Sequence, residues 1–515
     1  MGSRARPRGM LVRSITLALA TGLVAAPTAG ADDGFLTSEP EMLALSGSAP
    51  AGSSLKALIS SGDVIDGFEF QGIPDGIGVM PGPGGSAVAF VNHEESRVPF
   101  QGQADFQDAS VSRLTLNTTP GDHEGAVLDA SVAIPASAGF IRFCSSTMVG
   151  PAEGFTRYTY LTGEESNDNL DVPTGAPYGP DPSIAPQREA GLAVILDGET
   201  GEYAAVPGMG RHNHENVTAV PGGWDQIALI SGDDTFSAPS SQLYLYLADS
   251  ESDLWADHGS LWAFRVTRTD EGKVDAADPF NGANDYGDIE DGDDWKGRFI
   301  RVPTKIAKGL TAQEPQAALE DWSNRNNVFQ FVRVEDIDYD RNDPRVIYFT
   351  DTSTTRVVPN LDTGRLMRAS SGAGLYDRGR VFRMEFDEDN PRRVTSFSIF
   401  LNGDAGEPSV PGGPILSPDN LGTSENSMMV QEDATNAKVW MYDFSSETWA
   451  VVAQVTDSQS ESSGIVDASE WFGPGAWLLD VQAHNPALFV EQQQIGSTLF
   501  KQEAGQLLLM KIPGS

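Results

Sequence analysis

A short β-type run that ends in or near acidic residues recurs about six times along this chain. The runs read SAVAFVNHEES, RYTYLTGEES, QIALISGDD, RVIYFTDTS, SMMVQEDAT and GAWLLDVQAH. A second β-type run usually follows after a loop, so the repeating unit is strand, loop, strand and turn. One unit cannot bury its own apolar face, whereas six units arranged radially can, and they leave only short edges. The repeat therefore predicts an all-β fold, a six-bladed β-propeller with loop and short-helix insertions.

The recurring acids predict a metal site. In a propeller the inner strands line a central channel, so an acid at the end of each inner strand would form a ring of carboxylates at one mouth. Such a ring repels itself unless cations neutralise it, and clustered oxygen ligands suit calcium. The alternative is that these acids are ordinary turn residues, since Asp is common at strand ends.

Helix-like segments are scarce. The best candidates are SSLKALISSG, residues 53–62, and TAQEPQAALEDWSN, residues 311–324. The 54 Gly and 32 Pro residues are scattered through the chain, and no Pro/Ser-rich linker divides it. We therefore expect residues 32–515 to form a single domain.

The N-terminus resembles a secretory signal peptide. Arg4, Arg6, Arg8 and Arg13 precede an apolar stretch, and PTAGADD offers a cleavage site after Ala31. Since no twin-arginine pair is present, residues 1–31 predict a Sec-type signal and a secreted protein, extracellular or periplasmic. No second long apolar run follows, so we expect no membrane span. We also expect a monomer.

The charge balance limits the partners. The formal net charge is −39, and loss of residues 1–31, which hold four arginines and no acid, would make it more negative. This charge excludes a nucleic-acid binder held by phosphate contacts. It is consistent either with calcium sites or with a general adaptation to salt or solubility.

Five motifs carry candidate chemistry. They are VNHEESR with Glu94 and Arg97, the CSSTMVG…LTGEES segment with Cys144 and Glu165, GMGRHNHENV with Arg211 and Glu215, FVRVEDIDYD with Arg333 and Glu335, and MVQEDAT with Asp433. Carboxylates suit hard cations and a thiolate suits transition metals, so the set suggests two kinds of metal. The arginines either hold an anion such as phosphate or form salt bridges with the acids.

These motifs, in this order, resemble those of the PhoX-type alkaline phosphatases. The resemblance runs from about residue 64 to the C-terminus, with weaker matches at SGDD, SPDNLG and DVQAH. The polar asparagine-containing segment that precedes the cysteine in that family is not found here, where SVAIPASAGFIRF stands. The spacing from the cysteine to Glu-Glu is also longer.

The resemblance implies a secreted, metal-dependent phosphatase that hydrolyses phosphate monoesters with an iron–calcium cluster at the channel mouth. Its cofactors would be Ca²⁺ and Fe³⁺. The implied metal ligands are Glu94, Cys144, Glu165, Glu215, Glu335 and Asp433. Arg333 and Arg211 would orient the phosphate of the substrate. For Cys144, the only cysteine, the alternative is a buried inert thiol.

Two other functions fit the carboxylate ring without needing Cys144. One is a non-catalytic calcium-binding propeller that binds an extracellular ligand, and the other is a phytase-like calcium-dependent hydrolase. The acidic stretch NDYGDIEDGDDWKG, residues 284–297, is a separate feature. It predicts either a solvated loop or a calcium-pinned lid over the channel mouth.

Overall fold

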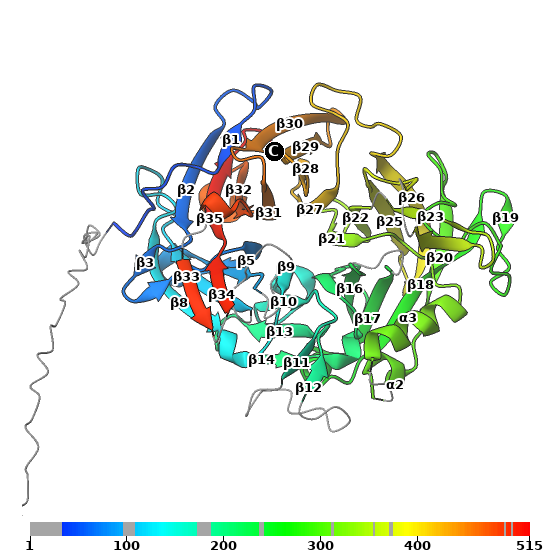
Figure 1. Ribbon diagram of the computed structural model, residues 1–515. Coiled ribbons are helices and arrows are strands. Elements are labelled where there is room, and N and C mark those ends of the chain that lie inside the picture. Colours follow the sequence, from blue (N-terminus) through cyan, green and yellow to red (C-terminus); the bar gives the residue numbers. More distant parts are fainter. Residues whose placement is uncertain are drawn as a thin grey trace, which may run out of the picture.

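The computed structural model describes residues 33–95, 109–171, 187–235, 241–310, 314–353, 356–369, 374–488, 491–495 and 498–515. The proposed signal peptide, residues 1–31, lies outside these ranges. Strands dominate the described chain, and their sheets are arranged in a ring around a common central axis (Figure 1). The prediction of an all-β, propeller-like fold is therefore confirmed. Within the described residues, no helix is long and apolar enough to cross a membrane.

Four of the sheets are antiparallel and have four or five strands each. The first is β5 (Pro74–Pro81), β6 (Ala87–His93), β7 (Ser110–Leu116) and β8 (Val127–Ile134). The second is β9 (Phe143–Val149), β10 (Thr159–Glu164), β13 (Ala193–Asp197) and β14 (Tyr203–Ala205). The third is β27 (Pro418–Thr423), β28 (Ser427–Glu432), β29 (Lys438–Asp443), β30 (Thr448–Val455) and β1 (Leu43–Leu45). The fourth is β31 (Ser460–Asp467), β32 (Ala476–Ala483), β35 (Ala504–Lys511) and β2 (Ser54–Ser60).

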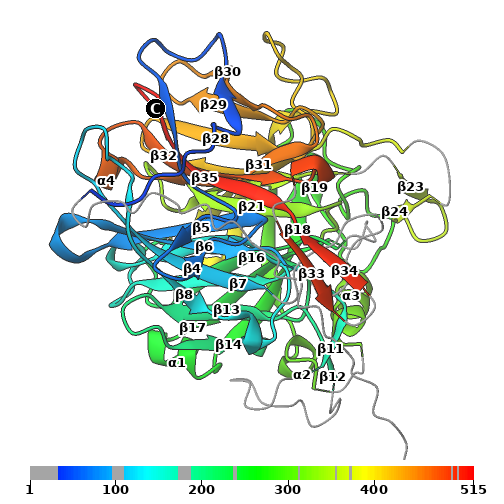
Figure 2. The ribbon, with the colours of Figure 1, turned by 60° about the vertical axis from the view of Figure 1, so that its left-hand side comes forward.

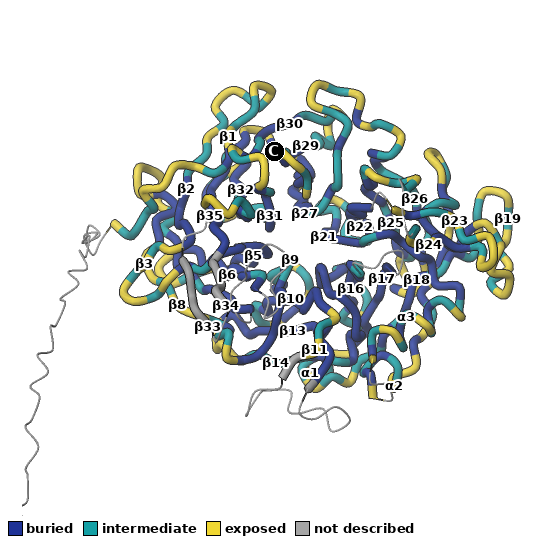
Figure 3. The backbone as a smooth tube through the Cα atoms, viewed as in Figure 1, coloured by how far each residue is buried: buried dark blue, intermediate teal, exposed yellow. Residues whose placement is uncertain are grey.

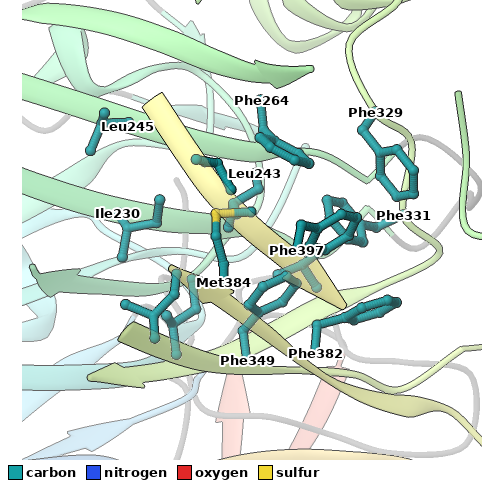
Figure 4. Packing of buried hydrophobic residues seen from close by; sticks show 14 of the residues in the cluster. Ile230, Leu243, Leu245, Phe264, Phe329, Phe331, Phe349, Phe382, Met384 and Phe397 are labelled. Atoms are coloured by element: carbon teal, nitrogen blue, oxygen red, sulfur yellow. The ribbon is translucent and has the colours of Figure 1, made fainter. Parts of the chain in front are cut away.

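A ten-stranded sheet occupies the rest of the ring. Its order is β15 (His214–Ala219), β16 (Ile227–Asp233), β17 (Leu243–Ala248), β18 (Ser260–Thr269), β20 (Trp295–Arg301), β26 (Asn390–Asn402), β25 (Arg380–Asp387), β22 (Val346–Asp351) and β21 (Val334–Tyr339), with β19 (Gly272–Lys273) paired to β18. Its two end strands, β15 and β21, contact each other, so the sheet nearly closes on itself. An aromatic core that includes Phe264, Phe331, Phe382 and Phe397 fills its interior (Figure 4).

Six inner strands form a closed ring around the channel. Each of β5, β9, β15, β21, β27 and β31 contacts the next, and β31 contacts β5. These strands are largely buried, while exposed segments lie at the periphery (Figure 3). Strand β2, near the start of the described chain, pairs with the C-terminal β35 and so closes the ring.

Three of the inserted strand pairs project from the same side of the ring of sheets. Three two-stranded pairs lie between the second and third strands of their sheets, and Figure 2 shows them on one side of the molecule: β11 (Asn169–Asp171) with β12 (Gln187–Glu189), β23 (Val357–Asn360) with β24 (Arg365–Arg368), and β33 (Glu491–Ile495) with β34 (Thr498–Gln502). A fourth pair is β3 (Val64–Ile65) with β4 (Phe68–Glu69). The helices are α1 (Glu251–Trp255), α2 (Thr304–Ala307), α3 (Pro315–Arg325) and α4 (Ser469–Phe472).

One of the two helix predictions is wrong. Residues 311–324 overlap α3, but residues 53–62 contain strand β2 instead of a helix. Leu55 and Ala57 pair with Met510 and Leu508 of β35. This long-range pairing buries the C-terminal half of β2 and overrides its local helix preference.

Candidate metal centre

The second residue of every inner strand belongs to one cluster at a single mouth of the channel. These residues are Asp75, Cys144, Glu215, Glu335, Asp419 and Glu461. A β-bulge interrupts the pairing of each inner strand with its neighbour, near the start of the strand in most sheets. Bulges bend a strand and redirect its side chains, and they are frequent next to active sites.

The acids found from the repeat lie on a different strand from the one predicted. The six runs form β6, β10, β16, β22, β28 and β32, and each is the second strand of its sheet, not the inner one. Because neighbouring strands are antiparallel, the end of each second strand pairs with the start of an inner strand, as His93 does with Pro74. The acids therefore still reach the same mouth.

Some acids at these strand ends have structural roles. Glu164 accepts hydrogen bonds from the backbone N–H groups of Ile141 and Leu192 and pairs with Arg188. Asp351 likewise accepts from the N–H groups of Val332 and Arg333. For these two acids, the contacts fit the alternative that they are structural residues at strand ends and do not bind metal. Successive residues of a strand point to opposite sides, so the residue that follows can face the mouth.

A cavity of about 240 Å³ brings the clustered residues together. Every metal ligand predicted from the sequence lines it, as does Arg333. The complete lining is Glu94, Arg142, Cys144, Glu165, Glu215, Asp234, Arg333, Glu335, Asp419, Asp433, Glu461, Gln482 and His484.

Four overlapping groups, formed by these residues and by Asp75, which accepts a hydrogen bond from Cys144, could each hold a metal ion. They are Asp75, Glu94 and Cys144; Cys144, Glu165 and Glu215; Glu215, Glu335 and Asp419; and Asp419, Asp433 and Glu461. Within each group the ligand atoms lie within 4.8 Å of one another. Cys144, Glu215 and Asp419 each belong to two groups. The arrangement therefore fits a chain of ions that share bridging ligands better than one isolated ion.

The buried acids of the cluster also favour the binding of cations. Burial raises the pKa of Asp75 to about 7, with a further contribution from Glu94. Burial, and then the charge of Glu335, raise the pKa of Glu215 well above its usual value. The Oε1 atom of Glu215 is buried and has no hydrogen-bond partner. A buried carboxylate oxygen without a donor is stabilised when a metal ion binds to it.

We expect the metal-free protein to lose stability as the pH rises. The raised pKa values mean that the folded state holds protons that the unfolded state has released. This contribution to stability is present below the unfolded pKa near 4 and is lost as the pH rises through the folded value, about 7 for Asp75. Thermal unfolding of chelator-treated protein should give a higher Tm at pH 5 than at pH 8. Added calcium should raise the Tm more at pH 8, and a metal-free Tm that increases from pH 5 to pH 8 would contradict this expectation.

Cys144 lies inside the cluster instead of in an apolar core. Its Sγ atom donates a hydrogen bond to Asp75 Oδ2 over 2.9 Å. Burial, and then Asp75, raise the pKa of the thiol, because every charged neighbour that affects it is an acid. A metal ion would reverse this balance, since a coordinating thiol is deprotonated. The interpretation of Cys144 as a buried inert thiol therefore fits its surroundings poorly.

Two arginines bring positive charge to the cavity. The Nε and Nη2 atoms of Arg333 donate to both carboxylate oxygens of Asp234, over 2.7 and 2.6 Å, and Nη2 lies 3.4 Å from Glu335 Oε1. Arg142 Nη1 donates to Glu94 Oε1 over 2.6 Å. Both arginines line the cavity, so each can form salt bridges with the ring and still face an anion held there.

Arg211 is not brought to this cavity. Its Nη2 atom donates to the backbone carbonyls of Glu189 and Ala190, and it is absent from the cavity lining. The second arginine that lines the cavity beside Arg333 is Arg142, which was not predicted, instead of Arg211. Arg97 lies outside the described residues.

Several residues of the cluster and of its cavity were missed from the sequence. Asp75, Asp419 and Glu461 start inner strands that share no distinctive motif, although Asp419 lies in the weakly matching SPDNLG. His484 lies in DVQAH, between Glu503 Oε2 at 2.6 Å and Glu461 Oε1 at 3.1 Å. One pattern could have identified Asp75, Asp419 and Glu461: each inner strand has an acid or a cysteine at its second position.

The acidic stretch 284–297 lies against the ten-stranded sheet. Asp285 is buried, and one of its oxygens accepts from the N–H group of Leu366 over 2.8 Å. Asp291 accepts from Asn402, and Asp294 accepts from Ser396. These acids hold the loop through hydrogen bonds, and the metal-like groups found among the described residues do not include them.

The fold is similar to that of a solved phosphatase structure. The PhoX of Pseudomonas fluorescens in complex with vanadate, a transition state analogue, superposes with a TM-score of 0.60 at 16% identity, over 91% of this chain and 97% of that one. Hydrazine synthase of Kuenenia stuttgartiensis matches with a TM-score of 0.34 at 9% identity, over 81% of this chain and 96% of that one. No curated protein matches this sequence.

A family comparison identifies the group to which the chain belongs. Residues 137–461, more than half of the chain, match the model of the family described as alkaline phosphatase PhoX. The matched region includes Cys144, Glu215, Glu335 and Glu461 of the candidate metal-binding cluster. The chain belongs to the PhoX alkaline phosphatase family, enzymes that hydrolyse phosphoric monoesters.

Proposed function

We propose that this protein is a secreted, metal-dependent phosphomonoesterase whose iron–calcium cluster is held at the channel mouth. The observation that carries the proposal is the chain of four overlapping ligand groups, which combines one thiol with eight carboxylates. We assign iron to the groups that contain Cys144, because thiolates prefer transition metals to calcium. We assign calcium to the all-carboxylate groups around Asp419.

The residues of the chain itself would bind and orient the substrate. When bound, the metal ions supply charge stabilisation for an in-line displacement at phosphorus. Arg333, held by Asp234, and Arg142, held by Glu94, present planar forks that fit phosphate oxygens. The cavity of about 240 Å³ is small, so it fits a phosphoryl group and leaves the rest of the substrate outside.

We interpret the ten-stranded sheet as two blades joined by β20. Strands β15 to β18 would form one blade, and β21, β22, β25 and β26 the other, which gives six blades with the four smaller sheets. The six inner strands, each with its cluster residue at the second position, support this interpretation. We further propose that residues 1–31 are a Sec-type signal peptide and that the mature protein is a monomer.

The proposal predicts phosphatase activity that depends on calcium. The purified protein should release p-nitrophenol from p-nitrophenyl phosphate, with its highest rate at alkaline pH. Treatment with a calcium chelator should abolish the activity, and calcium, but not magnesium, should restore it, because magnesium demands an octahedral geometry that crowded carboxylates do not provide. Full activity after complete metal removal would contradict the proposal. Activity that survives in Cys144→Ser would instead favour a phytase-like calcium enzyme without iron.

A further inference from the structure

Three arginines form a row across the outer strands of the ten-stranded sheet. Arg265 of β18 lies directly opposite Arg298 of β20, and Arg298 lies directly opposite Arg393 of β26. Residues opposite each other on neighbouring strands project from the same face, with Cβ atoms about 5 Å apart. Like charges in such positions destabilise a sheet, so this row costs stability in the free protein.

The row is poorly neutralised. Within the described chain, no carboxylate forms an ion pair with Arg265 or Arg298, while Arg393 pairs with Asp387 over 3.1 Å. Arg265 is half-buried, and its Nε atom is buried without a hydrogen-bond partner. Burial, and then the charge of Arg298, lower the pKa of Arg265. Arg265 Nη1 donates to the backbone carbonyl of Asn326 over 3.2 Å, and Arg298 is exposed. In a protein whose net charge is −39, two opposed arginines that have no acidic partner in the described chain favour binding of an anion.

A wide cleft gives access to the row. Its volume is about 1030 Å³, and its lining holds five basic residues, Arg265, Lys273, Arg298, Arg392 and Arg393, against one acid, Asp275. The guanidinium of Arg392 lies over the ring of Trp262 at 5.0 Å, so an aromatic surface adjoins the charges. Strands β18, β20 and β26 lie toward the edge of the molecule in Figure 1, away from the inner strands that carry the metal-like cluster.

We propose that this cleft is a second anion site, which binds a phosphate-bearing polyanion outside the catalytic cavity. Arginine forks bind phosphate through paired, charge-assisted hydrogen bonds, and a row of three can contact more than one phosphate group. Bound phosphate would reduce the repulsion between Arg265 and Arg298. The site would take a free oligophosphate or the end of a phosphorylated polymer.

Calorimetric titration with methylenediphosphonate, whose P–C–P bridge resists hydrolysis, tests the proposal. The wild-type protein should bind at two sites, one in the catalytic cavity and one in the cleft. The Arg265→Gln/Arg298→Gln variant should bind normally in the catalytic cavity, whereas its binding at the cleft should be weaker by at least about tenfold. Its rate on p-nitrophenyl phosphate should equal that of the wild type. The control Lys305→Gln/Arg325→Gln removes the same charge from exposed positions and should keep both sites.

The same variants exclude a purely structural role for the row. Without ligand and at low salt, Arg298→Gln should unfold at the same temperature as the wild type or higher, because it removes a like-charge contact. A clearly lower Tm, or two unchanged sites in the Arg265→Gln/Arg298→Gln variant, would overturn the proposal. Long-chain polyphosphate should compete for the cleft if the natural ligand is polymeric, whereas competition only by small anions would indicate a free oligophosphate. The count of binding sites does not depend on activity, so failure of the proposed phosphatase function would be recognised separately.

Discussion

Glu215→Gln is expected to lower phosphatase activity by at least about 10³-fold and to release metal from the protein. Glu215 belongs to two of the four ligand groups, one with Cys144 and Glu165 and one with Glu335 and Asp419. A glutamine keeps the shape of the side chain but removes the charge that both groups need. One substitution therefore weakens two metal positions together. Steady-state kinetics with p-nitrophenyl phosphate and elemental analysis of the same sample give the two readouts.

A loss of folding would not mimic this result. Glu215 is buried among other acids, so the substitution relieves repulsion in the metal-free state. Metal-free Glu215→Gln should therefore unfold at a higher temperature than metal-free wild type at pH 8. The control Glu202→Gln changes an exposed glutamate and should leave activity and metal content unchanged. Wild-type activity in Glu215→Gln would contradict the assignment of Glu215 as a shared ligand.

Arg333→Lys is expected to lower kcat/KM by about 10²-fold while the protein keeps its metal. Lysine preserves the positive charge near Asp234. It cannot form the planar bidentate contact that Arg333 makes with the Asp234 carboxylate and that we propose for the phosphate. Arg333→Gln should be more harmful, because it leaves the buried Asp234 carboxylate without its partner. Kinetics and elemental analysis of both variants separate a loss of phosphate orientation from a loss of metal.

Arg341 provides a control for Arg333. Its Nη2 atom donates to both carboxylate oxygens of Asp338, over 3.1 and 2.9 Å, and its side chain is 26% exposed, against 23% for Arg333. Arg341 lines another cavity, which does not include the metal-like cluster. Arg341→Lys should therefore leave kcat/KM unchanged. Equal losses in Arg333→Lys and Arg341→Lys would show that the effect at Arg333 is not specific to the catalytic cavity.

The sequence supported the fold class because the repeat is long and regular. It did not order the strands within each sheet, since the acidic runs of β6, β10 and β28 and the true inner strands have similar β propensity. Strand order depends on which strands face the channel, and this is decided by packing around the whole ring. The helix predicted at residues 53–62 failed for a related reason, because β2 pairs with β35 at the far end of the chain.

The candidate site was predicted wherever a residue lies in a distinctive motif. Cys144, Glu215 and Glu335 follow this rule. Asp75 and Glu461 lie near the starts of strands, where the local sequences, PDG and SES, are common in turns and loops. The β-bulges place these side chains beside Cys144 and Asp433, and bulges depend on the register between strands. Register could not be read from one sequence, so this part of the cluster required the structure.

Elemental analysis of the purified mature protein, with a visible absorption spectrum of the same sample, tests the central claim most directly. We predict iron together with calcium, and an absorption band from thiolate bound to iron that disappears in Cys144→Ser. Calcium without iron, or a band that persists in Cys144→Ser, would contradict the assignment of Cys144 as the iron ligand of a mixed cluster.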